Sequence, residues 1–153
     1  MKKLTCLVLL LCLTACSAVS TPTKPFEPAL AAQLTEANVF SEPLEPLDAD
    51  LIWILYSLEQ SGANREDLTD AVGYCSTGAT CEQVVVLCFS QKASATSARE
   101  SLSSYLEGQI QANRNYRPAE VPKLEKAILS QRDNTVLLLV ANDYDAAGRL
   151  IDN

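Results

Sequence analysis

The chain has 153 residues, of which 12 are basic, 19 are acidic and none is histidine. This length suits one modest domain with a short tether. The lack of histidine excludes Ser-His-Asp and Cys-His catalysis and most zinc sites. With a net charge of −7 the chain has no basic stripe for phosphates, so we expect no nucleic-acid partner.

The first residues have the pattern of an export signal. Lys2 and Lys3 precede an apolar run over residues 4–13, which has the length of a secretory-signal core. The run falls short of the roughly 20 residues that a transmembrane helix needs. It ends in Leu13-Thr14-Ala15-Cys16, which resembles the lipobox of bacterial lipoproteins. The alternative is a plain signal peptide with a chance cysteine.

That resemblance implies a lipid anchor on Cys16. In the lipoprotein family the thiol takes a diacylglycerol and a peptidase cuts just before the cysteine. We therefore expect a lipoprotein signal peptide at residues 1–15, the lipidated Cys16 and a tether rich in Ser, Thr and Pro at 16–25, and one domain at 26–153. After cleavage ten basic residues remain against nineteen acidic ones. An anionic membrane repels such a domain, so the lipid would hold it there.

Two helices are predicted at the start of the domain. Pro28 suits the first turn of a helix over residues 29–37, and Asp48 is a candidate N-cap for a second helix over residues 49–60. We expect the second helix to be largely buried, because its apolar residues cover a broad face, with Trp53 as a lid over the core edge. The residues of that face are Leu51, Ile52, Leu55, Tyr56 and Leu58.

The middle of the chain predicts a hairpin and a long helix. A charged loop over residues 65–70 leads to strands at 71–76 and 82–89, and the second is a nearly continuous β-branched run typical of a central strand. A helix should follow from Ser94 or Ser97 to about residue 113, with Ser97 and Glu100 as a capping box. Its expected buried stripe is Ala95, Ala98, Leu102, Leu106 and Ile110, and the serines between them should face water.

The last third predicts a second hairpin and a final helix. Pro118 ends the long helix, and residues 119–125 hold about one helical turn. Strands follow at 126–132 and 135–141, with Asp133-Asn134 as a two-residue turn, before a helix from Asn142 or Asp143 to about residue 151. The fold class is therefore α+β, with N-terminal helices and then a ββαββα unit. Its four-stranded, mainly antiparallel sheet is covered by helices.

The domain also resembles a family of small lipoproteins from Gram-positive, clostridia-like bacteria that share a domain of unknown function. The resemblance extends from Phe26 to the C-terminus. It rests on Leu51–Tyr56, the strand at 82–89, the long helix, Tyr116-Arg117-Pro118-Ala119-Glu120, and the last strand with Asn142-Asp143. It implies fold and location but no functional residues. The cysteines at positions 75, 81 and 88 depart from the family pattern.

Three thiols, those of Cys75, Cys81 and Cys88, lie in the expected exported domain. Cys75 and Cys81 flank the first hairpin turn, so a disulfide between them is possible. The alternative is free thiols buried as small hydrophobic groups. Their spacing with Cys88 matches no metal knuckle, and no histidine can activate a nucleophilic thiol.

Two further stretches have simpler explanations. The stretch 142–145 with Gly148 faintly resembles a calcium loop, but it lacks alternating ligands and suits a helix cap better. The stretch 114–120 is either a binding lip or a helix-ending corner. We therefore expect no metal and no cofactor.

The sequence favours a non-enzymatic function. We expect a monomeric, lipid-anchored binding or scaffolding module on the extracytoplasmic side of the cell membrane, with another envelope protein as its partner. The alternatives are a small hydrolase that uses paired carboxylates and a domain that senses a small ligand or an ion. A pocket with two facing carboxylates would favour the hydrolase, and an exposed apolar patch would favour the module.

Overall fold

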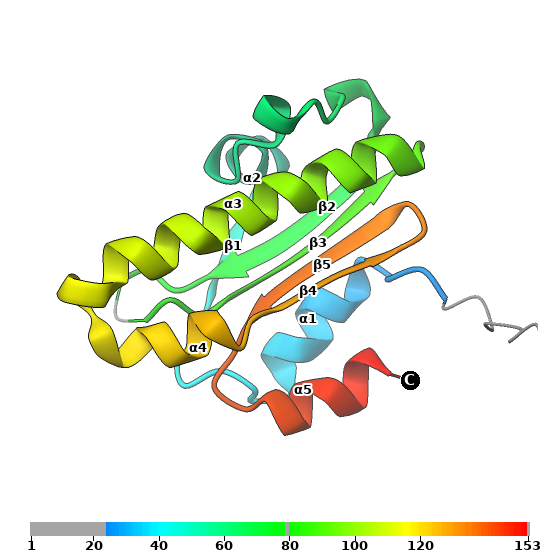
Figure 1. The fold of residues 1–153 in the computed structure, drawn as a ribbon. Helices are drawn as coiled ribbons and strands as arrows, with labels where there is room; N and C mark the ends of the chain where they lie inside the picture. Colours follow the sequence, from blue (N-terminus) through cyan, green and yellow to red (C-terminus); the bar gives the residue numbers. More distant parts are fainter. Residues whose placement is uncertain (1–23, 79, 153) are drawn as a thin grey trace, which may run out of the picture.

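A five-stranded antiparallel sheet forms the centre of the domain (Figure 1). The computed structural model describes residues 24–78 and 80–152. The strands lie in the order β1-β2-β3-β5-β4, and every neighbouring pair is antiparallel. Their bounds are β1 (Glu45–Leu47), β2 (Leu68–Cys75), β3 (Gln83–Phe89), β4 (Ile128–Arg132) and β5 (Thr135–Val140).

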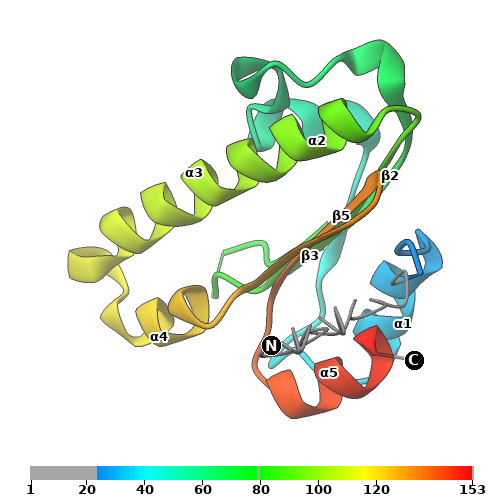
Figure 2. The same ribbon diagram turned by 45° about the vertical axis from the view of Figure 1, so that its right-hand side comes forward.

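Helices cover both faces of the sheet, which is seen nearly edge-on in Figure 2. One face carries α1 (Ala29–Glu36) and α5 (Tyr144–Ile151), and the other carries α2 (Ala49–Leu55), α3 (Lys92–Tyr116) and α4 (Val121–Glu125). Three short 3-10 helices complete the described elements, namely η1 (Leu58–Ser61), η2 (Arg65–Asp67) and η3 (Pro118–Glu120). The domain is thus α+β with three layers.

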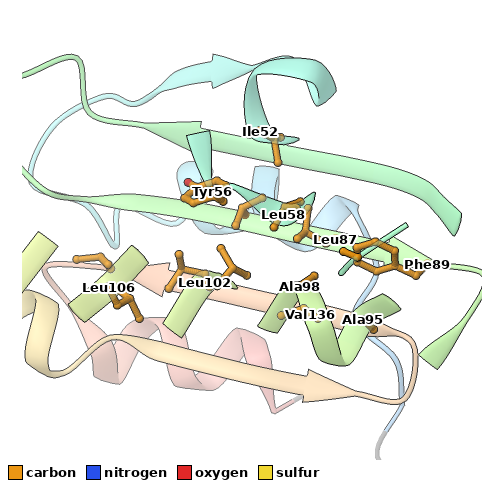
Figure 3. Packing of buried hydrophobic residues seen from close by; sticks show 14 of the residues in the cluster. Ile52, Tyr56, Leu58, Leu87, Phe89, Ala95, Ala98, Leu102, Leu106 and Val136 are labelled. Atoms are coloured by element: carbon orange, nitrogen blue, oxygen red, sulfur yellow. The ribbon is translucent and has the colours of Figure 1, made fainter. Parts of the chain in front are cut away.

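Each face of the sheet has its own hydrophobic core. Side chains alternate along β3, so Val84 and Val86 enter the cluster under α1 and α5, while Val85 and Leu87 enter the cluster under α3. Because both faces are covered, β3 and β5 are buried along almost their whole length. This explains why their sequences are continuous apolar runs rather than alternating ones. Figure 3 shows the cluster between α3 and the sheet.

The long helix α3 confirms most of its predicted stripe but not its start. Ala95, Ala98, Leu102 and Leu106 are buried as expected, and Ile110 is half-buried against the same cluster. The helix begins at Lys92 without a side-chain cap, and it ends at Tyr116. The capping box is therefore wrong, because Ser97 and Glu100 lie inside the helix.

The serines of α3 also correct the sequence prediction. Ser94 and Ser101 are buried rather than solvated. The hydroxyl of Ser94 donates to Oδ2 of Asp67 at 2.5 Å, and that of Ser101 donates to the carbonyl of Ser57 at 3.2 Å. These bonds tie α3 to the 3-10 segments above it and satisfy polar atoms that burial would otherwise penalise.

The second helix is shorter and more exposed than predicted. Its α-helical part ends at Leu55, because Ser57 adopts a left-handed backbone (φ 52°) that starts η1. Ile52, Tyr56 and Leu58 are buried as expected, whereas Leu51 and Leu55 face solvent. The expectation of a largely buried helix is wrong, since this helix of seven residues presents only part of its surface to the sheet.

The sheet has five strands where four were predicted. The extra strand β1 comes from the proline-interrupted stretch 41–47, and it pairs with β2 through Glu45↔Cys75, Pro46↔Tyr74 and Leu47↔Gly73. A proline is tolerated there because β1 is an edge strand and need not donate on its outer side. The ββαββα order holds in outline, but η3 and α4 stand between α3 and β4.

The predicted caps and turn are confirmed elsewhere. Asp48 accepts from the amide of Leu51 at 2.7 Å, and Asp143 accepts from that of Ala146 at 2.8 Å. The second hairpin turns at Asp133 with φ 53°. Within the part of the chain that the structure describes, no helix has the length and apolar character to cross a membrane.

Candidate functional site

A polar pocket of about 280 Å³ opens at one end of the sheet. It lies between the connection from β2 to β3, the C-terminal half of α3 and the end of α2. Its polar lining residues are Cys75, Ser76, Thr77, Thr80, Cys81, Glu82, Gln83, Tyr105, Gln109 and Arg117, and Leu55 also lines it. Polar groups from several elements converge on this pocket, which makes it a candidate binding site.

Arg117 shapes the pocket by holding the β2–β3 connection. Its Nη1 donates to the carbonyls of Gly78 at 3.1 Å and Thr80 at 3.3 Å, and its Nε donates to Oδ1 of Asn113 at 2.9 Å. The planar guanidinium can satisfy several acceptors at once. Arg117 can take this position because α3 ends at the preceding residue, where Pro118 stops the helix.

The segment after Arg117 fixes the same connection from a second side. Glu120 accepts the amide of Cys81 at 2.9 Å through Oε2. Its Oε1 lies 3.4 Å from Nζ of Lys123, which is one turn further along. The stretch 114–120, proposed as a lip or a corner, is therefore a corner that clamps the pocket wall.

A buried ion pair involves Glu82, which also lines the pocket. Glu82 precedes β3, and its side chain is 0% exposed. Its carboxylate accepts from Nζ of Lys123 at 2.7 Å and from both the amide and the hydroxyl of Ser41 at 2.7 Å each. Burial alone would lower the pKa of Lys123, but its hydrogen bond to Glu82 and the nearby charges of Glu82 and Glu120 outweigh this and raise it.

A second carboxylate supports the connection from outside. Glu42 accepts from the hydroxyls of Ser76 at 2.5 Å and Thr80 at 2.8 Å. The hydrogen bond from Ser76, followed by that from Thr80, lowers the pKa of Glu42. Both ends of the β2–β3 connection are therefore anchored to the segment before β1.

Tyr105 lines the pocket and packs against the buried Tyr56. The rings of Tyr56 and Tyr105 meet edge to face with centroids 4.8 Å apart. The hydroxyl of Tyr56 donates to Oε1 of Gln83 at 2.8 Å, which satisfies the buried amide of a residue inside a strand. Burial raises the pKa of Tyr105, so its hydroxyl is a neutral donor at ordinary pH.

The three cysteines of the domain carry free thiols. Cys75 and Cys81 both line the pocket, but the register pairs Cys75 with Gln83 rather than with Cys81. Cys88 lies at the other end of β3, against the second core cluster. Burial raises the pKa of all three, that of Cys88 to about 11, so none is an activated thiolate. The disulfide between Cys75 and Cys81 stays a prediction.

An exposed apolar surface borders the pocket. We call Leu51, Ile54 and Leu55 the α2 ridge. Their exposed fractions are 45%, 73% and 38%, and Leu55 also lines the pocket rim. Among the described residues Tyr116 is the other large hydrophobic side chain that is exposed, and it lies at the far end of α3.

The remaining predicted residues lie elsewhere. Cys16 and the lipobox fall outside the described residues. Asp143 caps α5, and no group of three or more His, Cys, Asp or Glu in the described ranges could hold a metal ion. Sequence reasoning missed Glu82 and Lys123. The sequence signal that could have indicated Glu82 is its place as an acidic residue directly before a continuous apolar strand.

A second hollow, of about 370 Å³, is less suited to binding. It lies where the chain enters α1, beside Phe26 and Arg132. The guanidinium of Arg132 is 4.3 Å from the centre of the Phe26 ring and 3.7 Å from Asp152. Its charge is thus already engaged by the protein itself.

The protein is therefore a three-layer α+β domain with a polar pocket beside the connection from β2 to β3. The chain belongs to the DUF4358 family, a domain of unknown function, whose model matches residues 42–141. The matched part spans β1 to β5 and so includes the pocket and the α2 ridge. No curated protein and no solved structure matches the chain significantly.

Proposed function

We propose that this protein is a lipid-anchored module on the extracytoplasmic side of the membrane that binds another envelope component without catalysis. The observation that carries the binding role is the α2 ridge, an exposed apolar surface beside a polar pocket. Contiguous exposed apolar residues mark interaction sites on protein surfaces.

The carboxylates near the pocket support binding rather than hydrolysis. A pair of catalytic carboxylates would face each other across an open cavity. Here Glu82 and Glu120 share Lys123, and their oxygens also accept from Ser41 and the amide of Cys81. These contacts give both groups a structural role.

The anchor is proposed from the sequence of the first residues. The lipobox at residues 13–16 would place a diacylglycerol on Cys16, leaving residues 1–15 as a removed signal and 16–25 as the tether. A single acyl chain binds a membrane only marginally, whereas two anchor a protein stably. A lipoprotein of a Gram-positive bacterium would expose the domain to the cell wall.

Lipidation can be tested directly in a bacterial host. The full chain and its Cys16→Ala variant are expressed with an alkyne-labelled fatty acid, and Cys12→Ala, inside the apolar run, is the matched control. We expect labelling and cleavage before residue 16 in the wild type and in Cys12→Ala, and neither in Cys16→Ala. Labelled or normally cleaved Cys16→Ala protein would refute the anchor.

The binding role has its own test in intact cells. A photocrosslinking residue at position 54 should give a discrete adduct with an envelope protein, and the same group at the exposed position 116 should not. Equal adducts from both positions would mean that capture is random, and would count against a binding surface on α2.

A further inference from the structure

The α2 ridge is a coherent surface rather than a scatter of exposed residues. Leu51, Ile54 and Leu55 are spaced by three and four positions, so they project from the same side of the helix. An adjoining side carries Ile52, which is fully buried, and the chain then places Tyr56 in the core. The helix therefore has two apolar sides, and the described residues cover only one of them.

The chain segment that carries the ridge is strongly acidic. Asp50 lies four residues before Ile54, and Asp48 caps the helix three residues before Leu51. Between residues 41 and 70 the chain has one basic residue, Arg65, which pairs with Asp50 at 2.7 Å. The same span has eight acidic residues, namely Glu42, Glu45, Asp48, Asp50, Glu59, Glu66, Asp67 and Asp70.

The apolar ridge and its acidic segment together determine which kind of partner can bind there. A second copy of the chain would bring the same carboxylates face to face in a two-fold interface, which is repulsive. An anionic membrane surface is repelled for the same reason. A polypeptide segment with apolar residues on one side and Lys or Arg on the other can pack against the ridge and pair with the nearby carboxylates.

We infer that the α2 ridge is the docking surface for a basic amphipathic segment of another envelope protein. The inference rests on the proposed binding function and names the class of partner. Ile54, with the largest exposed fraction of the three at 73%, is the central contact. Leu55 also lines the pocket, so the ridge and the pocket adjoin.

The protein carries its own reporter for this contact. Trp53, the single tryptophan of the chain, is half-buried immediately before Ile54 and lies under Arg65, whose guanidinium carbon is 5.5 Å from the ring centre. A segment that covers Ile54 changes the surroundings of this indole. Binding of a peptide without tryptophan can therefore be followed by tryptophan fluorescence.

The experiment uses the full chain in neutral phosphatidylcholine vesicles, with empty vesicles as the blank. The probe is a synthetic amphipathic helix with leucines on one side and lysines on the other, and its counterpart has glutamate in place of lysine. We expect saturable binding of the lysine peptide and none of the glutamate peptide. Raising NaCl from about 0.05 to about 0.5 M should weaken binding, because exposed charges are then screened.

Two serine variants locate the contact. Ile54→Ser should raise the Kd about tenfold or more, as truncation of a central apolar anchor does. Tyr116→Ser, which removes an equally accessible apolar side chain outside the ridge, should leave the Kd unchanged. Unchanged circular dichroism confirms folding, and Ile54→Leu should restore binding.

Several results would overturn the inference. They are absence of binding, equal binding of the glutamate peptide, and indifference to Ile54→Ser. Saturable energy transfer between labelled copies, if lost in Ile54→Ser, would assign the ridge to a second copy. Adsorption to phosphatidylglycerol vesicles through Ile54 would assign it to a membrane. If fatty-acid labelling at Cys16 succeeds while the peptide fails, the anchor stands and the ridge assignment falls.

Discussion

Lys123 places its Nζ 2.7 Å from Oε1 of Glu82, a residue 41 positions away in the chain. The contact joins α4 to the start of β3 at the pocket, which Glu82 lines, and Ser41 also hydrogen-bonds the carboxylate. A charge this deeply buried is tolerated only when it is paired and hydrogen-bonded. The pair therefore couples the pocket wall to the stability of the whole domain.

Removing one partner of this pair should be costly. Lys123→Met leaves the Glu82 carboxylate buried without its cation, and we expect a loss of about 3 kcal/mol in the free energy of unfolding. This is the lower end for a broken buried pair, because Lys123 keeps 22% exposure. Urea denaturation measures the change, and Lys126→Met, at an exposed neighbouring position, is the matched control.

The double variant separates pairing from packing. Glu82→Gln combined with Lys123→Met should cost clearly less than the sum of the single changes, because neither charge is then stranded. Additive losses would show that the two side chains contribute independently, against the coupling inferred here.

The N-cap of α2 should control the ridge. Asp48 satisfies the amide of Leu51 at 2.7 Å, and Asp48→Ala should cost about 1 kcal/mol. Because α2 has only seven residues, the loss should appear first as faster amide exchange within the helix, with β3 still protected. Asp48→Asn, which retains capping, is the control, and uniform acceleration across the domain would contradict a local effect.

The parts of the fold that the sequence predicted are those fixed by local chemistry. The buried strands β3 and β5, the caps at Asp48 and Asp143 and the turn at Asp133 depend on patterns within a few residues. Strand β1 escaped prediction because its three residues include Pro46 and it exists only through pairing with β2.

The candidate site was less predictable for the same reason. Glu82, Lys123 and Ser41 come together from three separate segments, and no local pattern links them. The exposure of Leu51 and Leu55 depends on where α2 ends, which the left-handed Ser57 decides. The apolar content of this segment predicted a buried helix, so the sequence did not reveal that Leu51 and Leu55 are exposed.

Cys88 should make stability fall at alkaline pH. Burial, followed by the charge of Asp70, raises its pKa from 9.0 to about 11. The stabilisation that comes from the raised pKa of the Cys88 thiol is fully present below pH 9. Between pH 9 and about 11 the unfolded chain releases this proton first, so the free energy of unfolding drops as pH rises.

The effect of Cys88 is read by comparison with a variant. Urea midpoints from pH 8 to 11 should fall less steeply for Cys88→Ala than for the wild type. Some decline should remain, because burial also raises the pKa of Cys75 and Cys81. Parallel curves would mean that the Cys88 thiol ionises in the folded state as readily as in the unfolded chain.

The last prediction concerns Cys75 and Cys81, which are free thiols on the same pocket wall. If an oxidant joins them, the bridge closes a short loop, and short loops give small entropic gains of about 2–3 kcal/mol at most. Two core clusters, one on each face of the sheet, already hold the fold without it. Reduction should therefore lower the Tm only modestly, and Cys75→Ser with Cys81→Ser should melt like the reduced protein. Thermal melts by circular dichroism, with and without reductant, measure this. A collapse of structure on reduction would instead make the pair a structural staple.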